Sequence, residues 1–226
     1  GTVHDFNNLL QVVIGLAGLA KYEMPAGHAA HQHLARIEEV GEQAAHLAGQ
    51  LLTFSKQRPR QIHPVDLNAM VTQTVKMIRH VMPAEITIKT ELDATAPAVL
   101  GDEIPFKQVL MNLCLNARDA MPQGGQLTIR TTLDAPPAGL GANGSPWVHL
   151  SVQDTGSGME EAIRLRIFEP FFSTKERGTG LGLAVVVQIV KDFGGHIEVW
   201  SKPGEGTRFD FWLRPAKAEQ GAAVIV

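Results

Sequence analysis

Two glycine clusters set close together constrain the fold of this chain more than any other feature. The first is formed by Gly156 and Gly158, and the second is the run Gly178, Thr179, Gly180, Leu181 and Gly182. Because glycine lacks a Cβ atom, the first cluster lets the chain turn sharply beside a flat ligand. The second leads into an apolar run over residues 181–190 that predicts a helix, and free N–H groups at a helix start attract an anion. The stretch therefore predicts a site that holds an anionic ligand against backbone.

Asp154 and Lys175 define the expected ligand more closely. A helix start contributes only about 0.3–2 kcal/mol to anion binding, so a triphosphate also needs a metal ion or a lysine. Lys175 lies between the two clusters. A carboxylate at Asp154 can accept a hydrogen bond from the exocyclic amino group of adenine, and it repels the carbonyl oxygen that guanine carries there. The predicted ligand is ATP.

Two asparagines lie upstream on a helix predicted over residues 103–121. Asn112 and Asn116 are one turn apart and therefore share a face of that helix. Such a pair most often marks a solvated surface, because asparagine is a mediocre helix former. We interpret it instead as part of the ligand site, since Mg²⁺ takes oxygen ligands, keeps several waters and shares the phosphates of its substrate.

Taken together, these motifs resemble the sensor histidine kinases of the GHKL ATPase superfamily. The matching runs are N-L-C-L-N-A-R-D-A-M from residue 112, D-T-G-S-G-M from 154, I-F-E-P-F-F-S-T-K from 167, G-T-G-L-G-L from 178 and D-F-G-G-H-I-E-V-W-S-K-P-G-E-G-T-R-F from 192. The resemblance implies that Asn116 is the Mg²⁺ ligand with Asn112 assisting, that Arg118 approaches phosphate, and that residues 172–178 form a short lid over ATP.

The N-terminal part predicts two helices, over residues 1–24 and 29–56, with apolar side chains recurring at helical intervals. Two helices cannot enclose such stripes alone, so we expect a second copy to complete a four-helix bundle, making the protein a homodimer.

His4 begins the run H-D-F-N-N near the start of the first helix. A single histidine there is ordinarily a surface residue, but Asp5 is placed to orient the imidazole, and Asn8 lies one turn on. The run resembles the phosphoacceptor motif of the H-D-F-N-N subgroup of histidine kinases. The resemblance implies that His4 receives the γ-phosphoryl group, that Asp5 is the acid/base residue, and that Asn8 orients water for dephosphorylation of a partner's phosphoaspartate.

The expected fold class is α+β. An antiparallel helical hairpin over residues 1–58 precedes a two-layer α/β sandwich of the GHKL type over 59–216, in which helices cover one face of a mixed sheet. Residues 57–64 are predicted to link the two domains. The predicted elements of the sandwich are a helix capped by Asp66, a strand over 85–91, a helix over 103–121, strands over 126–133 and 147–153, a helix over 181–190 ended by Gly194 and Gly195, and a hairpin over 196–201 and 207–213.

Composition excludes several other classes of protein. The chain has 226 residues, is 44% hydrophobic and carries a net charge of −3, which suits a soluble globular protein and gives no basic excess for nucleic acid. The single cysteine, Cys114, cannot form an internal disulfide and is expected to be a buried apolar residue in a reducing compartment. The longest apolar stretch, residues 9–20, is shorter than the roughly 20 residues of a membrane span. We expect a cytoplasmic location, no membrane contact by this segment, and any membrane anchor outside it.

The last residues turn from a polar stretch over 217–221 to an apolar run over 222–226. This run is similar to the first strand of a receiver domain, which indicates a hybrid histidine kinase; a short C-terminal tail or leftover sequence is the alternative.

The resemblance implies phosphoryl transfer from Mg·ATP to His4, and then to an aspartate of a response-regulator receiver domain in cis or in trans, with phosphatase activity also expected. Two alternatives remain open. A GHKL ATPase that hydrolyses ATP for conformational work would need a carboxylate where Asn112 stands. A nucleotide-sensing interaction module would bind ATP without catalysis.

Overall fold

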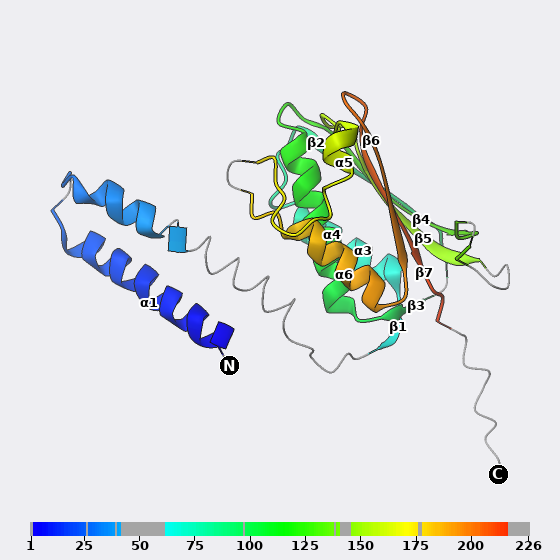
Figure 1. Cartoon of the computed structure of the whole chain (residues 1–226), viewed down its shortest axis with the longest axis horizontal. Helices are drawn as coiled ribbons and strands as arrows, with labels where there is room; N and C mark the ends of the chain where they lie inside the picture. Colours follow the sequence, from blue (N-terminus) through cyan, green and yellow to red (C-terminus); the bar gives the residue numbers. More distant parts are fainter. Residues whose placement is uncertain are drawn as a thin grey trace, which may run out of the picture. The chain divides into compact units, whose positions relative to one another are not determined.

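The chain divides into two compact units, Gly1–Pro59 and Arg60–Val226, each considered by itself (Figure 1). The computed structural model describes residues 2–25, 27–38, 40–41, 62–96, 98–137, 139–140, 146–175 and 178–216, and for residues 2–11 the description covers the backbone.

The first unit contains two helical segments that run in opposite directions. Helix α1 (Thr2–Glu23) matches the prediction, and residues 30–38 and 40–41 are also helical. Lys21 Nζ lies 2.7 Å from Glu38 Oε2, and a Cβ atom on Gly41 would lie 2.6 Å from Ile14 Cγ1, so residues 14–21 of α1 contact residues 38–41 of the second segment. Residues 42–56 of the predicted second helix lie outside the described residues.

Apolar side chains remain on the surface of α1. They are Val12, Val13, Leu16 and Leu19, which are 57%, 47%, 61% and 54% exposed. In contrast, Ala17 is 5% exposed, because it lies on the face turned toward the second helical segment. One helical neighbour therefore covers only part of the apolar stripe of α1.

The second unit is built on a five-stranded mixed sheet. Its strands are β2 (Ile86–Leu92), β4 (Gly125–Asp134), β5 (Trp147–Asp154), β6 (His196–Lys202) and β7 (Gly206–Leu213). The order is β2-β4-β5-β7-β6, in which β2 and β4 are parallel and all other neighbours are antiparallel. The predicted strands and the hairpin β6–β7 are confirmed, with ends that differ by a residue or so.

Three helices cover one face of this sheet, as Figure 1 shows. They are α3 (Leu67–Ile78), α4 (Glu103–Ala120) and α6 (Gly182–Asp192), and a single turn, α5 (Glu161–Arg164), precedes α6. Asp66 caps α3 by accepting a hydrogen bond from Ala69 N at 2.9 Å, as predicted. The prediction that helices lie on one side of a mixed sheet is confirmed.

A separate two-stranded sheet corrects the predicted linker. β1 (His63–Val65) pairs antiparallel with β3 (Val99–Gly101), so the last residues assigned to a linker belong to a strand. Pro64 lies opposite Leu100 in this sheet. Proline is tolerated there because each strand of a two-stranded sheet is an edge strand, where a missing N–H group breaks no central ladder.

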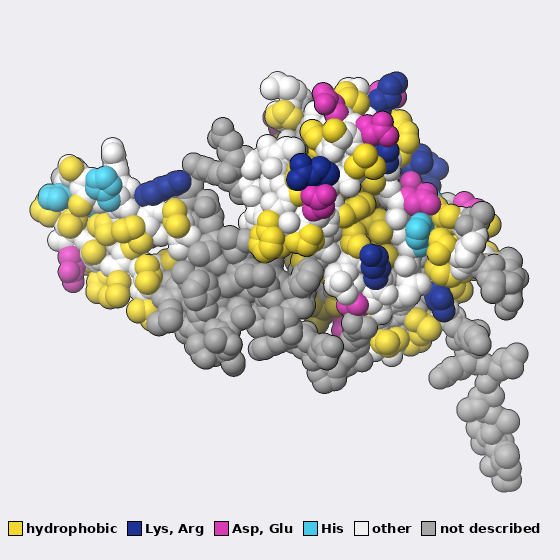
Figure 2. All heavy atoms as spheres, viewed as in Figure 1, with side chains coloured by type: hydrophobic (Ala, Val, Ile, Leu, Met, Phe, Trp, Pro, Cys, Tyr) yellow, Lys and Arg dark blue, Asp and Glu magenta, His cyan; other side chains and the backbone are white. Residues whose placement is uncertain are grey.

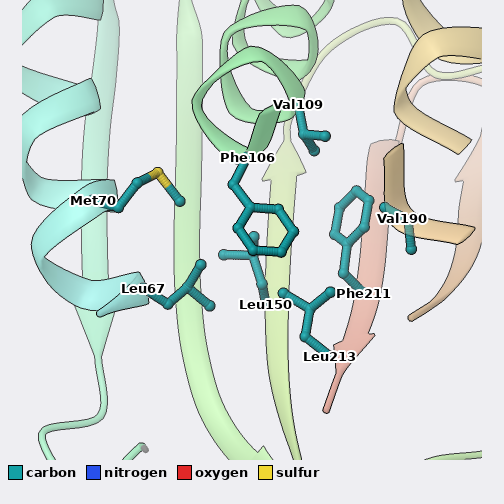
Figure 3. Close-up of a pocket in the computed structure, with 8 residues that line it drawn as sticks. All are labelled: Leu67, Met70, Phe106, Val109, Leu150, Val190, Phe211 and Leu213. Carbon is teal, nitrogen blue, oxygen red and sulfur yellow. The ribbon is translucent and has the colours of Figure 1, made fainter. Parts of the chain in front are cut away.

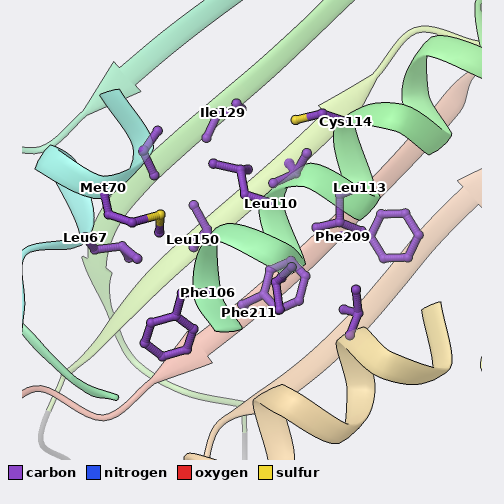
Figure 4. Packing of buried hydrophobic residues seen from close by; sticks show 14 of the residues in the cluster. Leu67, Met70, Phe106, Leu110, Leu113, Cys114, Ile129, Leu150, Phe209 and Phe211 are labelled. Carbon is purple, nitrogen blue, oxygen red and sulfur yellow. The ribbon is translucent and has the colours of Figure 1, made fainter. Parts of the chain in front are cut away.

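The core lies between the helices and the sheet. Figure 4 shows side chains of α3 and α4 meeting those of β4, β5 and β7, among them Met70, Leu110 and Phe211. Cys114 of α4 is fully buried in this cluster, and burial raises the pKa of its thiol to about 12. The prediction of Cys114 as a small buried apolar residue is confirmed.

Candidate functional site

Within the second unit, helix α4 contacts both glycine-rich segments and the lysine between them. Asn112 Nδ2 donates a hydrogen bond to the carbonyl oxygen of Gly182 at 3.1 Å, which joins α4 to the first turn of α6. One turn on, Asn116 Oδ1 accepts a hydrogen bond from Lys175 Nζ at 3.0 Å. At the end of α4, Ser157 N donates to the carbonyl oxygen of Ala120 at 2.9 Å. The asparagine helix therefore positions both glycine-rich segments and the lysine between them.

Lys175 is held by a second oxygen as well. Its Nζ lies 2.7 Å from Asp119 Oδ2, and Asp119 Oδ1 accepts hydrogen bonds from Arg118 Nε and Nη2 at 3.0 and 2.9 Å. Partial burial alone raises the pKa of Asp119, but the hydrogen bonds from Lys175 and Arg118 outweigh it and hold that pKa below its usual value. Asp119 is thus a member of the site that the sequence did not single out.

Asp154 ends strand β5 in a buried position, 5% exposed. Its Oδ1 accepts hydrogen bonds from the backbone N–H groups of Gly156 at 2.8 Å and Thr207 at 3.3 Å. Burial raises the pKa of Asp154, and the two backbone hydrogen bonds only partly offset that effect. The second oxygen, Oδ2, makes no hydrogen bond to any residue that the structure describes, which leaves it able to accept one from a ligand.

The glycines of the motifs are required by the protein's own packing. A Cβ atom on Gly156 would lie 2.6 Å from the carbonyl oxygen of Ala120. Gly158 has φ +64°, and a Cβ there would overlap the carbonyl oxygen of Lys202. Gly182 differs, since the nearest atom to its Cβ would be Asn112 Cγ at 3.8 Å. Close approach of this loop to the end of α4 and to the end of β6 explains the first cluster, a reason that the sequence did not give.

The second glycine run is anchored to the segment before Lys175. Phe171 N donates to the carbonyl oxygen of Gly180 at 3.0 Å, and a Cβ on Gly180, at φ +66°, would overlap the backbone of Phe171. Phe171 itself has φ +67°, an uncommon conformation for an aromatic residue. A Cβ on Gly178 would likewise overlap the side chain of Ser173. Residues 176 and 177, in the predicted lid, lie outside the described residues.

The start of α6 is suited to an anion. Leu181 stands at the N-cap, and its side chain cannot accept a hydrogen bond from the first turn as a serine or aspartate would. Its own N–H group donates to Thr179 Oγ1 at 3.3 Å. The N–H groups of the following turn therefore depend on solvent or a ligand for a partner.

A pocket shown in Figure 3 lies elsewhere, between α3, α4, α6 and the sheet. Its lining consists of Leu67, Met70, Phe106, Val109, Leu150, Val190, Phe211 and Leu213. These side chains are all apolar, so this pocket is a packing gap in the core and does not suit a phosphate.

The metal assignment rests on the amide oxygen of Asn116, with Asn112 expected to assist. In the part of the chain that the structure describes, no group of three or more His, Cys, Asp and Glu side chains forms a metal site. Asn116 Oδ1 instead faces a cation, the ammonium group of Lys175, and Asp119 supplies a carboxylate oxygen to the same cation. A position that already receives a cation fits Mg²⁺ at Asn116 Oδ1, with the other ligands of the ion drawn from water and phosphate.

The phosphoacceptor motif lies in the first unit. His4, Asp5 and Asn8 fall within α1, so their backbone is helical and His4 is one turn from Asn8. Their side chains lie outside the described residues.

Charged side chains of both signs are mixed on the surface of the second unit. On the face shown in Figure 2, Lys and Arg side chains of the second unit are interspersed with Asp and Glu. Among the described residues, the helices include none with the length and hydropathy that a bilayer crossing requires.

The chain matches the model of an ATPase family and is similar to named sensor kinases. Residues 101–217 match the family described as histidine kinase-, DNA gyrase B-, and HSP90-like ATPase. The chain is 36% identical over 222 residues to the sensor kinase CckA of Brucella abortus (strain 2308), covering 94% of this chain and 23% of CckA. It is 34% identical over 214 residues to the sensor histidine kinase ZraS of Escherichia coli (strain K12), covering 94% of this chain and 44% of ZraS. It thus spans less than half of either relative.

A solved structure, that of full-length ShkA in complex with AMPPNP, has the same fold. The TM-score is 0.76 at 27% sequence identity, covering 96% of this chain and 45% of ShkA. The resemblance to sensor histidine kinases that the motifs indicated, and the GHKL-type sandwich, are confirmed.

Proposed function

Because the chain belongs to the family of histidine kinase-, DNA gyrase B-, and HSP90-like ATPases, we propose that it is an ATP-dependent protein histidine kinase of a two-component system. Its relatives CckA and ZraS are named sensor kinases, and ShkA was solved with the ATP analogue AMPPNP. The observation that carries the proposal is the set of contacts made by α4, which joins Asn116, Lys175 and the start of α6 next to the turn that follows Asp154.

The residues of the second unit would bind Mg·ATP. Asp154 Oδ2 accepts a hydrogen bond from the adenine amino group, since Oδ1 is already used by Gly156 and Thr207. The first turn of α6 and the ammonium group of Lys175 face the phosphates. Asn116 would hold the metal ion, and Asn112 keeps α6 in place by its hydrogen bond to the carbonyl oxygen of Gly182. A bound Mg²⁺ ion would neutralise phosphate charge during phosphoryl transfer.

The residues of α1 would receive the phosphoryl group. His4 attacks the γ-phosphorus through one ring nitrogen, and Asp5 accepts the proton from the other and orients the ring. The bond from the γ-phosphorus to the bridging oxygen of ADP breaks as the phosphorus–nitrogen bond forms. The phosphoryl group then passes to an aspartate of a response-regulator receiver domain. Asn8 serves a separate reaction, in which it orients a water molecule that hydrolyses the phosphoaspartate of the partner and releases free phosphate.

Domain organisation follows from the same proposal. Residues 1–58 form a dimerising helical hairpin that carries His4, residues 59–216 form the ATP-binding domain, and residues 217–226 are a linker or the start of a further domain. The exposed apolar side chains of α1 support dimerisation into a four-helix bundle. We place this part of the protein in the cytoplasm, where ATP and receiver domains are available.

Hydrolysis of ATP for conformational work is less well supported. Asn112 stands where such an ATPase needs a proton-accepting carboxylate, and its amide group is already committed to Gly182.

Incubation with γ-³²P-labelled ATP tests the proposal. The parent protein should acquire a label that is stable in base and lost in acid, as a phosphoramidate is, and His4→Gln should acquire none while it still binds AMPPNP. Label that persists in His4→Gln, or that survives acid, would contradict it. Release of free phosphate without any labelled protein would favour the hydrolysing ATPase, and binding without turnover would favour the sensing module.

A further inference from the structure

Asp119 links the two cations of the site. Each carboxylate oxygen serves one of them: Oδ2 accepts from Lys175 at 2.7 Å, and Oδ1 accepts two hydrogen bonds from Arg118 at 3.0 and 2.9 Å. The side chains of Lys175 and Asp119 are 43% and 34% exposed, so the group lies at the surface, where a ligand can reach it. One carboxylate between two cations leaves a net charge of about +1 for an incoming phosphate.

Lys175 is shared between two oxygens with different uses. Its Nζ also donates to Asn116 Oδ1 at 3.0 Å, the oxygen that the proposed function gives to the metal ion. A metal ion and an ammonium group compete for the same lone pairs, because both seek a negative oxygen. When the metal takes Asn116 Oδ1, Asp119 Oδ2 is the remaining oxygen of α4 that holds Lys175.

We infer that Asp119 is a positioning residue for nucleotide binding, which keeps Lys175 beside α4 both before and after the metal ion occupies Asn116. The inference rests on the proposed function. It concerns a residue that would touch neither the phosphates nor the metal but acts through Lys175.

The direction in which one substitution changes nucleotide affinity tests the inference. Asp119→Asn keeps the shape of the side chain and removes its charge. Removing a negative charge beside a triphosphate would by itself strengthen binding, because like charges repel. If Asp119 positions Lys175, the same change instead weakens binding of Mg·AMPPNP by about tenfold, a typical coupling between contacting residues.

A double-mutant cycle separates positioning from a general structural effect. In the Lys175→Met background, where no ammonium group remains to be positioned, Asp119→Asn should leave the affinity for Mg·AMPPNP unchanged or raise it. Glu103→Gln is the matched control, since it removes another carboxylate of α4 that pairs with a lysine, Lys107, at 2.6 Å. It should bind as the parent does. Isothermal titration calorimetry on the full chain measures all five proteins.

Hydrogen exchange in the nucleotide-free protein supplies the second readout. Lys175 N donates to Ser173 Oγ at 3.1 Å and Gly178 N donates to the carbonyl oxygen of Lys175 at 3.1 Å. Both amides should exchange faster in Asp119→Asn than in the parent or in Glu103→Gln.

Two results would overturn the inference. One is affinity in Asp119→Asn equal to or tighter than that of the parent. The other is that Asp119→Asn lowers the affinity for Mg·AMPPNP equally in the parent and in the Lys175→Met background, while hydrogen exchange at both amides stays unchanged. If the parent itself fails to bind Mg·AMPPNP, the proposed function is wrong, and the exchange rates of the nucleotide-free proteins still decide whether Asp119 holds Lys175.

Discussion

Asp154 is a largely buried residue that keeps one carboxylate oxygen open to a ligand. Its Oδ1 is satisfied by two backbone N–H groups, whereas Oδ2 has no partner among the described residues, although the residue is 5% exposed. Among the described residues, Trp212 Nε1 is the buried side-chain polar atom without a partner, so Oδ2 retains access to solvent. A water molecule can therefore occupy the position that the adenine amino group would take.

We expect Asp154→Asn to change binding and stability in opposite directions. The affinity for Mg·ATP should fall about ten- to hundredfold, since an amide nitrogen cannot accept from the adenine amino group. Burial raises the pKa of Asp154 above its ordinary value of 3.8, so ionisation costs the folded state stability as the pH rises from 3.8 through the folded pKa. At pH 7 the variant, which cannot ionise, should therefore be at least as stable as the parent.

Calorimetry with Mg·ATP and urea unfolding of the nucleotide-free proteins between pH 4 and pH 7 measure both quantities, with the parent titrated beside the variant. A variant that lost affinity and stability together would show that Asp154 serves the fold rather than adenine.

At the scale of elements, the loops of the site are fixed by glycines that contact other backbone. Gly158 lies against Lys202 of the β6–β7 hairpin, and Gly156 lies against Ala120 at the end of α4. Gly182, within the first turn of α6, has room for a methyl group. Substitution by alanine should therefore change stability differently at Gly158 and at Gly182.

Gly158→Ala should lower the free energy of unfolding by about 2–3 kcal/mol. The added Cβ would overlap the carbonyl oxygen of Lys202, and alanine is strained in the left-handed conformation that Gly158 adopts. Gly182→Ala should hold or gain stability by up to about 1 kcal/mol, since alanine favours a helix more than glycine does. If the backbone at residue 182 faces phosphate, Gly182→Ala should nevertheless bind Mg·ATP more weakly. Thermal unfolding with and without Mg·ATP distinguishes these effects, and a Gly182→Ala variant with unchanged affinity would remove residue 182 from the site.

Long periodic elements were predictable from the sequence, and short or contact-dependent features were not. The apolar repeat of α4 and the alternation in β4 and β5 each extend over several residues, so they identify those elements without tertiary information. β1 and β3 contain three residues each, too few for a pattern. Asp119 was missed because its role depends on a contact with Lys175, 56 residues away in sequence.

At the scale of the whole molecule, the apolar core and the proposed dimer interface belong to different units. The buried core cluster lies within residues 65–213, whereas the exposed apolar stripe lies on α1. A core that closes on itself lets the second unit fold without the first.

We expect residues 1–226 to sediment as a dimer and residues 60–226 as a monomer that still binds Mg·ATP. Leu16→Glu in the longer chain should shift it toward monomer, because Leu16 is 61% exposed on α1 and a charge there opposes burial at an interface. Analytical ultracentrifugation measures the masses, with Tyr22→Glu as a control at a position that is 88% exposed. A dimer that persists in residues 60–226 would place the interface in the second unit.

The single cysteine gives this fold a chemical reporter of its own opening. Cys114 lies on the sheet side of α4, fully buried, and its pKa of about 12 keeps the thiol protonated and unreactive while the domain is closed. A thiol reagent can therefore modify only those molecules in which α4 has separated from the sheet. The rate of labelling at Cys114 measures how often this opening occurs. A nucleotide that binds only the closed domain should slow that rate in proportion to the fraction of protein it occupies, so alkylation kinetics can follow occupancy of the site without any introduced label.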